Sequence, residues 1–107
     1  MARLAYVIKF VADMDRAVAF YSETFGFPVK MQTPFWSELD TGQTIFALHP
    51  ASDKDPAGSC QLGFNLDDLR GFYEAGKVAF NEPPKEQHGT LLAQMIDCEG
   101  ARVSLSG

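Results

Sequence analysis

The chain has 107 residues, of which 46% are hydrophobic, so it is long enough for one compact domain with a real core. Its formal net charge of -5, without a basic stripe, argues against a nucleic-acid partner and is compatible with a neutral or cationic small ligand. The apolar runs are short and are interrupted by Lys9, Asp13 and Arg16, so we expect a cytoplasmic protein with no transmembrane span, secretory signal or membrane partner.

The first stretch of the chain predicts a strand, a helix and a return into a second strand. Residues 4–11 alternate with period two and are rich in β-branched and aromatic side chains, which is typical of a buried strand. Asp13 then stands where a helix N-cap is expected, and apolar residues follow at helical spacing as far as Phe25. Gly26 is placed to end this helix in the left-handed conformation. The next predicted strands are residues 28–33, 35–40 and 44–49, with a turn at Thr41-Gly42.

The second half of the chain repeats this order of elements. Residues 49–58, rich in proline, glycine and charge, predict an exposed linker, and residues 59–66 predict a strand. Asp67 or Asp68 can cap a shorter helix that ends near Gly76. The remaining predictions are a brief strand at 78–80, a loop at 81–89 containing Pro83 and Pro84, and a hairpin of 90–96 with 101–106.

Each half therefore reads βαβββ, which predicts an α+β fold in a single domain of residues 1–107. The first module is expected at about residues 3–49, the linker at 50–58 and the second module at 59–106. Cys60 and Cys98 lack the spacing of a zinc site or a CxxC redox motif, so we expect reduced thiols.

Three segments carry a resemblance to a known family: VADMDRAVAFYSETFGFPV, WSELDTGQTIFALH and the closing DCEGARVSL. Together with the tandem βαβββ order, they resemble the vicinal oxygen chelate superfamily, which includes glyoxalases, fosfomycin and bleomycin resistance proteins and extradiol dioxygenases. The resemblance covers nearly the whole chain. It implies that each module curls into a half barrel of mixed sheet, that two modules enclose a cavity, and that the protein is a homodimer.

The resemblance also locates the positions where enzymes of the superfamily hold a divalent metal. They fall on Tyr6, at or near Ala47, on Gln61 and on Ser104. Only Gln61 keeps a plausible ligand chemistry, and neutral Tyr, Ala and Ser do not replace the missing donors. We therefore expect no cofactor and no metal at these positions. One alternative is a relocated metal site built from His49, Glu38 and His88, although these residues lack the local spacing of a metal motif.

Strand parity predicts which side chains line the cavity. Residues that alternate in phase with Tyr6, Ala47, Gln61 and Ser104 along their strands face inward. The helices are faced by Phe46, Leu48, Leu62, Phe64, Val103 and Leu105. The inward set mixes aromatic rings with scattered hydrogen-bonding groups, as a small-molecule site does. The candidate ligand-binding residues are Tyr6, Trp36, Glu38, Ala47, His49, Gln61, Asn65, Gln94, Arg102 and Ser104.

Three functions remain open on these grounds. The first is a metal-independent protein of the bleomycin-resistance type, which sequesters an aromatic or cationic compound: Trp36 and Tyr6 would stack on it and Glu38 would pair with its charge. The second is a glyoxalase-like lyase or isomerase, or a dioxygenase-like enzyme, with a non-standard divalent metal site. The third is a structural domain without a ligand, in which Trp36 fills the barrel or a dimer seam.

Overall fold

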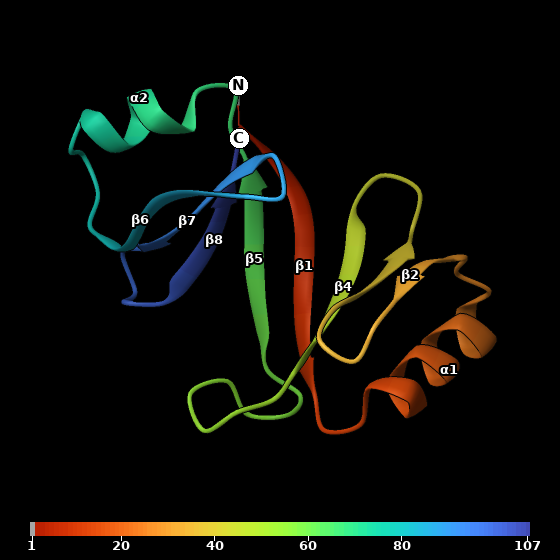
Figure 1. Ribbon diagram of the computed structural model, residues 1–107. Helices are drawn as coiled ribbons and strands as arrows, with labels where there is room; N and C mark the ends of the chain where they lie inside the picture. Colours follow the sequence, from red (N-terminus) through yellow and green to blue (C-terminus); the bar gives the residue numbers. More distant parts are fainter. Residues whose placement is uncertain (1) are drawn as a thin grey trace. The chain divides into compact units, whose positions relative to one another are not determined.

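The computed structural model describes residues 2–107 and divides into two compact units. We call Tyr6–Cys60 module one, and Gln61–Gly107 together with residues 2–5 module two. Each module combines a four-stranded mixed sheet with one helix (Figure 1). The predicted α+β class and the repeated βαβββ order are confirmed.

Module one has its strands in the order β2-β3-β4-β1, with β1 parallel to β4 and the other neighbours antiparallel. The first strand and the helix lie within a residue of their predicted ends, because the alternating apolar pattern and the two caps define them locally. The elements are β1 (Arg3–Val11), α1 (Met14–Phe25), β2 (Val29–Gln32), β3 (Ser37–Asp40) and β4 (Ile45–Pro50).

Both caps of α1 have the predicted geometry. The Asp13 side chain accepts a hydrogen bond from the Arg16 backbone N–H at 3.1 Å, which satisfies one of the free donors of the first turn. At the other end Gly26 has φ 74°, and its N–H donates to the Ser22 carbonyl at 2.8 Å. A left-handed residue at this position ends the helix and returns the chain toward β2.

The sheet of module one packs apolar side chains on both faces. On the helix side, Val18 of α1 packs with Val11, Leu39 and Leu48, and all four side chains are buried. On the opposite face Ile8, Phe10 and Ala47 form a second buried cluster. The division follows the period-two alternation of β1 and β4, which sends successive side chains to opposite faces.

Module two has its strands in the order β5-β8-β7-β6, with β5 parallel to β8. Its helix is capped by Asp68, which accepts from the Gly71 N–H at 3.0 Å, and Leu69 begins the helix and is buried in the core. Ala93, Val103 and Leu105 complete that buried cluster. The elements are β5 (Cys60–Asn65), α2 (Leu69–Glu74), β6 (Phe80–Gln87), β7 (Thr90–Ile96) and β8 (Arg102–Ser106).

The prediction of a loop at residues 81–89 is wrong, because β6 runs from Phe80 to Gln87. Pro83 and Pro84 are typical of a loop, but β6 is the last strand of its sheet and its pairing with β7 shifts register between Glu82 and Lys85. Proline is tolerated at a bulge of an edge strand, where its missing N–H costs no ladder bond. The turn itself is two residues long, at His88 and Gly89, with φ of 51° and 80°.

Leu62, which is predicted to face the helices, is 45% exposed and so does not belong to the buried core. The helix of module two has 6 residues, against 12 in module one, so it leaves more of its sheet face uncovered. Cys60 and Cys98 are free, as expected, and both are exposed.

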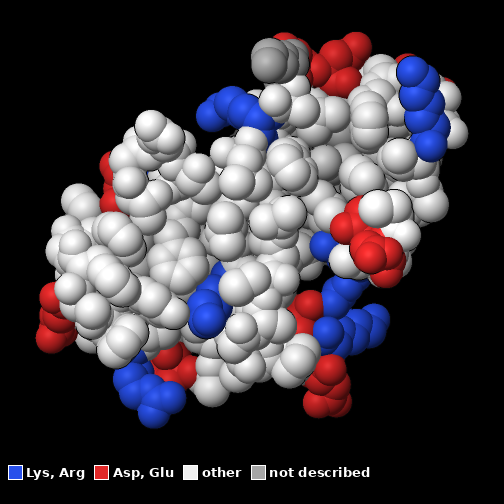
Figure 2. All heavy atoms as spheres, turned by 180° about the vertical axis from the view of Figure 1, so that it is seen from behind, with Lys and Arg blue, Asp and Glu red and all other residues white. Residues whose placement is uncertain are grey.

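Charged side chains are scattered on the molecular surface. Figure 2 shows basic and acidic groups standing singly or in small clusters, with uncharged surface between them, on the face that it presents. Within residues 2–107, no helix is both long and apolar enough to cross a membrane.

Candidate functional site

The face of module one that lies opposite α1 carries one row of registered side chains across all its strands. Ile8 pairs with Ala47, Ala47 with Glu38, and Glu38 with Met31. Directly opposed residues of neighbouring strands point to the same face of a sheet, so this row places the Glu38 carboxylate between apolar neighbours. Met31, which is 43% exposed, lies beside that carboxylate although it was not among the predicted site residues.

The Glu38 carboxylate is oriented by Trp36. The indole Nε1–H of Trp36 donates to Glu38 Oε2 at 2.7 Å, and both side chains are half-buried. Trp36 is itself fixed by Thr33, whose Oγ1 accepts from the Trp36 N–H at 2.9 Å and donates to the Trp36 carbonyl at 2.6 Å. The ring and the carboxylate therefore form a pre-organised pair.

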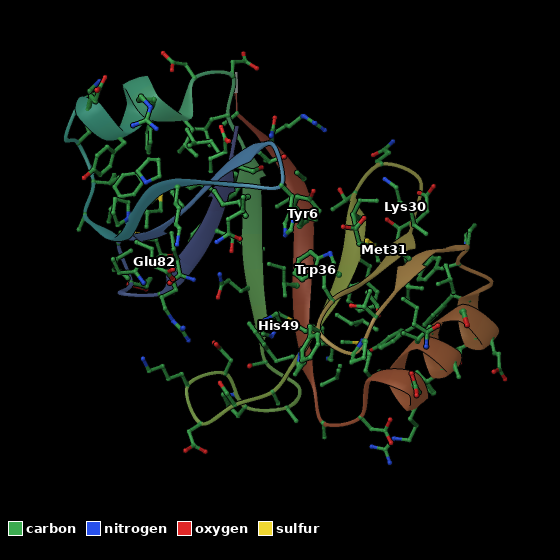
Figure 3. The ribbon with its side chains drawn as sticks, in the orientation of Figure 1. Tyr6, Lys30, Met31, Trp36, His49 and Glu82 are labelled. Carbon is green, nitrogen blue, oxygen red and sulfur yellow. The ribbon has the colours of Figure 1, made fainter. Side chains whose placement is uncertain are left out.

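Three further rings surround this pair. The ring centroids of Tyr6 and Trp36 are 6.1 Å apart, those of Trp36 and His49 are 6.4 Å apart, and both pairs meet edge to face. The Phe10 ring, on the neighbouring strand β1, contacts the His49 ring edge to face, with the two ring centroids 5.5 Å apart. In the view of Figure 3, Tyr6, Trp36 and His49 follow one another along β1. Edge-to-face packing leaves ring faces and edges available to a further aromatic group.

His49 is exposed and has a defined orientation. Its Nδ1 lies 2.8 Å from the Pro50 carbonyl oxygen, and because a carbonyl can only accept, Nδ1 carries the proton of this hydrogen bond. In the neutral ring, Nε2 is then the acceptor. His49 thus adds one acceptor and one ring edge beside Trp36.

Within residues 2–107, the Trp36 indole is the hydrogen-bond partner of the Glu38 carboxylate, and no lysine or arginine pairs with it. A half-buried carboxylate bordered by aromatic rings favours a cation, which gains from the charge and from the ring faces together. The arrangement suits a compound with a positive charge and a planar or aliphatic body.

The corresponding row of module two is polar. Gly63 pairs with Ser104, Ser104 with Gln94, and Gln94 with Glu82. Polar side chains in and beside this row are hydrogen-bonded to one another. Gln61 Nε2 donates to Ser104 Oγ at 2.7 Å, and Asn65 Nδ2 donates to Ser106 Oγ at 3.0 Å. Asn81 Nδ2 likewise donates to Gln94 Oε1.

The structure brings the predicted site residues together within each module. Tyr6, Trp36, Glu38 and His49 are neighbours in module one, whereas Ala47 is wholly buried beneath them and forms part of the floor. In module two the predicted set holds Gln61 with Ser104, Asn65 with its partner Ser106, Gln94 with its partner Asn81, and Arg102 opposite Ile96. The residues missed by sequence reasoning are Met31, Phe10, Asn81, Glu82 and Ser106, which only the strand registers and side-chain contacts could reveal.

The donors at the superfamily's metal positions do not fit a divalent ion. Ala47 has no donor atom, Tyr6 offers a phenol and Ser104 a hydroxyl, so the amide oxygen of Gln61 is the one remaining ligand of the usual kind. Among residues 2–107 there is no group of three or more His, Cys, Asp or Glu side chains placed to hold a metal ion. His88, part of the alternative metal set, lies in the turn between β6 and β7.

Comparison with known proteins gives a family match at the level of sequence. A family model described as Glyoxalase/Bleomycin resistance protein/Dioxygenase superfamily matches residues 3–100. No curated protein matches this chain.

Solved structures share the fold at low sequence identity. A Streptomyces coelicolor methylmalonyl-CoA epimerase variant in complex with 2-nitronate-propionyl-CoA is 20% identical, with a TM-score of 0.74 over 97% of this chain and 92% of that one. A hypothetical protein from Bacillus halodurans C-125 is 12% identical, with a TM-score of 0.78 over 98% and 93%. A glyoxalase/bleomycin resistance protein/dioxygenase superfamily member from Vibrio splendidus 12B01 is 13% identical, with a TM-score of 0.72 over 99% and 98%.

Proposed function

We propose, since the chain belongs to the Glyoxalase/Bleomycin resistance protein/Dioxygenase superfamily, that it binds a small aromatic cation without a divalent metal, in the manner of a bleomycin-resistance protein. The observation that carries this proposal is the Glu38 carboxylate, held at 2.7 Å by the Trp36 indole beside the rings of Tyr6 and His49. Glu38 neutralises the ligand's charge, and the rings contact its planar part. The protein's role is then sequestration in the cytoplasm, with no bond made or broken.

The proposal rests on desolvation as well as on charge. Glu38 already shares one carboxylate oxygen with an indole N–H, and Ile8, Ala47 and Phe10 exclude water from the floor below it. A cation that reaches the second oxygen meets a charge in surroundings less polar than water, where the attraction is stronger. A neutral aromatic compound of the same size gains only from the rings.

Fluorescence titration tests this proposal, because Trp36 is the only tryptophan of the chain. Benzyltrimethylammonium should change its emission saturably, while benzyl alcohol, which lacks the charge, and tetramethylammonium, which lacks the ring, should bind more weakly. The Glu38→Gln variant should weaken benzyltrimethylammonium binding by about fivefold or more, as expected for the loss of one partly desolvated charge contact. Glu23→Gln, which changes the net charge equally at an exposed position of α1, serves as the matched control.

Two outcomes of this titration would contradict the proposal. Equal affinity for benzyl alcohol and benzyltrimethylammonium would show that Glu38 does not contribute to binding. The absence of a saturable response to any aromatic cation would favour the structural domain without a ligand. The enzyme alternative makes a different prediction: a lyase or dioxygenase with a non-standard site would retain a stoichiometric divalent metal after dialysis. Elemental analysis of the purified protein measures this directly.

We also propose that the chain forms a homodimer through β2 and the loop that follows it. This strand lies at the outer edge of the module-one sheet, all its residues are exposed, and Phe35 beyond it is 76% exposed. An edge strand flanked by apolar side chains is suited to contact with a second copy. Light scattering should then give twice the chain mass of 11.8 kDa, and Phe35→Ser should lower it while Phe20→Ser should not. A monomer at every concentration would contradict this arrangement.

A further inference from the structure

A groove of about 300 Å³ opens in module one where β1 ends and α1 begins. It is lined on one side by Lys9 of β1, on another by Arg16 and Phe20 of α1, and on a third by Ala57 and Gly58 of the loop before β5. Lys9 points to the face of the sheet opposite Ile8 and Phe10, because adjacent residues of a strand alternate. The groove therefore lies on the other face of the sheet from Trp36 and Glu38, although Phe10, whose ring contacts His49, also belongs to its lining.

The third wall of the groove is held in place by the backbone. The Phe10 N–H donates to the Ser59 carbonyl at 2.9 Å, and the Gly58 N–H donates to the Phe10 carbonyl at 2.8 Å. Ser59 Oγ also donates to the Pro56 carbonyl at 2.6 Å, which closes the turn before β5. In Figure 1 this loop runs beside the end of β1. The sequence predicts only an exposed linker here, so these bonds reveal a fixed wall.

The charge in the groove is positive on balance. Lys9 is half-buried and Arg16 is exposed, and within residues 2–107 neither side chain takes part in a salt bridge. The one acidic residue of the lining, Asp13, accepts from the Arg16 backbone N–H as the helix cap. Two cationic groups and one carboxylate leave an excess of one positive charge, which suits a monoanion.

An aromatic wall completes the groove. Phe20 is 58% exposed although it is a large apolar side chain, and it meets Tyr21 edge to face with ring centroids 5.2 Å apart. The exposed face of Phe20 offers a surface on which a planar ring can pack. A site with fixed walls, one apolar platform and a few polar groups is the usual composition of a small-molecule pocket.

We infer that this groove binds a small aromatic carboxylate, with its ring on Phe20 and its carboxylate between Lys9 and Arg16. The planar guanidinium of arginine matches a carboxylate through two parallel hydrogen bonds, and the ammonium of Lys9 adds a point charge. The proposed cation site takes the opposite charge and lies on the opposite face of the sheet.

NMR titration of the ¹⁵N-labelled chain with phenylacetate tests the inference. The amide resonances of Ala12, Ala57 and Gly58 should shift saturably, while phenylacetamide, which keeps the ring without the charge, should bind more weakly. Arg16→Gln and Lys9→Gln should each weaken phenylacetate binding by about two- to fivefold, the usual effect of one solvent-accessible charge pair. Asp13→Asn should strengthen it by a similar factor, because asparagine keeps the helix cap and removes the opposing charge.

Two control variants make the outcome specific. Arg70→Gln, an equal change of charge on α2, and Glu38→Gln on the other face should leave phenylacetate affinity unchanged. Equal binding of phenylacetamide, or an affinity that does not respond to Arg16→Gln and Lys9→Gln, would overturn the inference. Shifts confined to Tyr6 and Trp36 would do the same. Failure of the cation site would leave these groove shifts in place, so the two proposals fail separately.

Discussion

The two modules put different chemistry at the same registered positions. Phe10 and His49 are register partners in module one and meet ring to ring at 5.5 Å, whereas their counterparts in module two, Asn65 and Ser106, are joined by a hydrogen bond of 3.0 Å. Ala47 likewise corresponds to Ser104. Each lies in the last strand of its module and pairs with a residue of the parallel first strand, Ala47 with Ile8 and Ser104 with Gly63.

This difference shows how one backbone plan supports two kinds of surface. In module two amide and hydroxyl groups bond to one another in pairs, so the surface is polar and, among the described residues, carries no aromatic cluster of this kind. In module one apolar and aromatic side chains surround a single carboxylate, to which the Trp36 indole donates a hydrogen bond. The helix-side cores, by contrast, are both apolar and closely similar.

The largest expected effect comes from mutations in the apolar core on the helix side of each module. Leu48 and Leu69 are fully buried, at 0% and 1% exposure, so Leu48→Ala and Leu69→Ala should each lower the free energy of unfolding by about 2 to 5 kcal/mol. Urea denaturation measures both. A loss below about 1 kcal/mol for either leucine would show that its module lacks the close packing described above.

An exchange of side chains at equivalent positions should have a smaller effect. Ala47→Ser puts a hydroxyl into a site with 0% exposure and should cost about 1 to 3 kcal/mol. Ser104→Ala removes the acceptor of Gln61 Nε2, a residue that is 8% exposed, and should cost about 1 to 2 kcal/mol. Thermal or urea unfolding of the two variants checks this pair. If both changes were neutral, the two faces would tolerate polarity equally and the comparison would fail.

The helix ends give the smallest effect. Gly26→Ala should cost about 1 kcal/mol, because Gly26 has φ 74° and an added Cβ meets no atom within 4 Å, so only the backbone conformation opposes it. The corresponding C-cap of α2 is Ala75 in a right-handed conformation, with φ -65°. Ala75→Gly is therefore the matched change, and it should cost less than Gly26→Ala in the same denaturation assay. The reverse order would contradict the assignment of these caps.

The sequence predicts those features that neighbouring residues determine. The strand β1, the helix α1 and the caps at Asp13 and Gly26 follow from local pattern and are confirmed. The strand β6 does not follow from local pattern, because Pro83 and Pro84 indicate a loop unless the strand is known to lie at a sheet edge.

The site could be predicted only as a set of facing positions. Parity of the strands selected Tyr6, Glu38 and His49, but it could not indicate that the Trp36 indole bonds to Glu38, since that depends on the turn at Thr33. Met31 was missed for a related reason: its place opposite Glu38 depends on the register of β2, which contains an irregularity between Val29 and Met31.

The indole N–H resonance of Trp36 tests the central claim most directly, because this proton forms the bond to Glu38. Titration of the ¹⁵N-labelled chain with benzyltrimethylammonium should move the resonance saturably, and in Glu38→Gln it should begin at a different position and respond at higher concentrations of the cation. A wild-type resonance that stays in place while fluorescence shows saturation would contradict a cation site at Glu38.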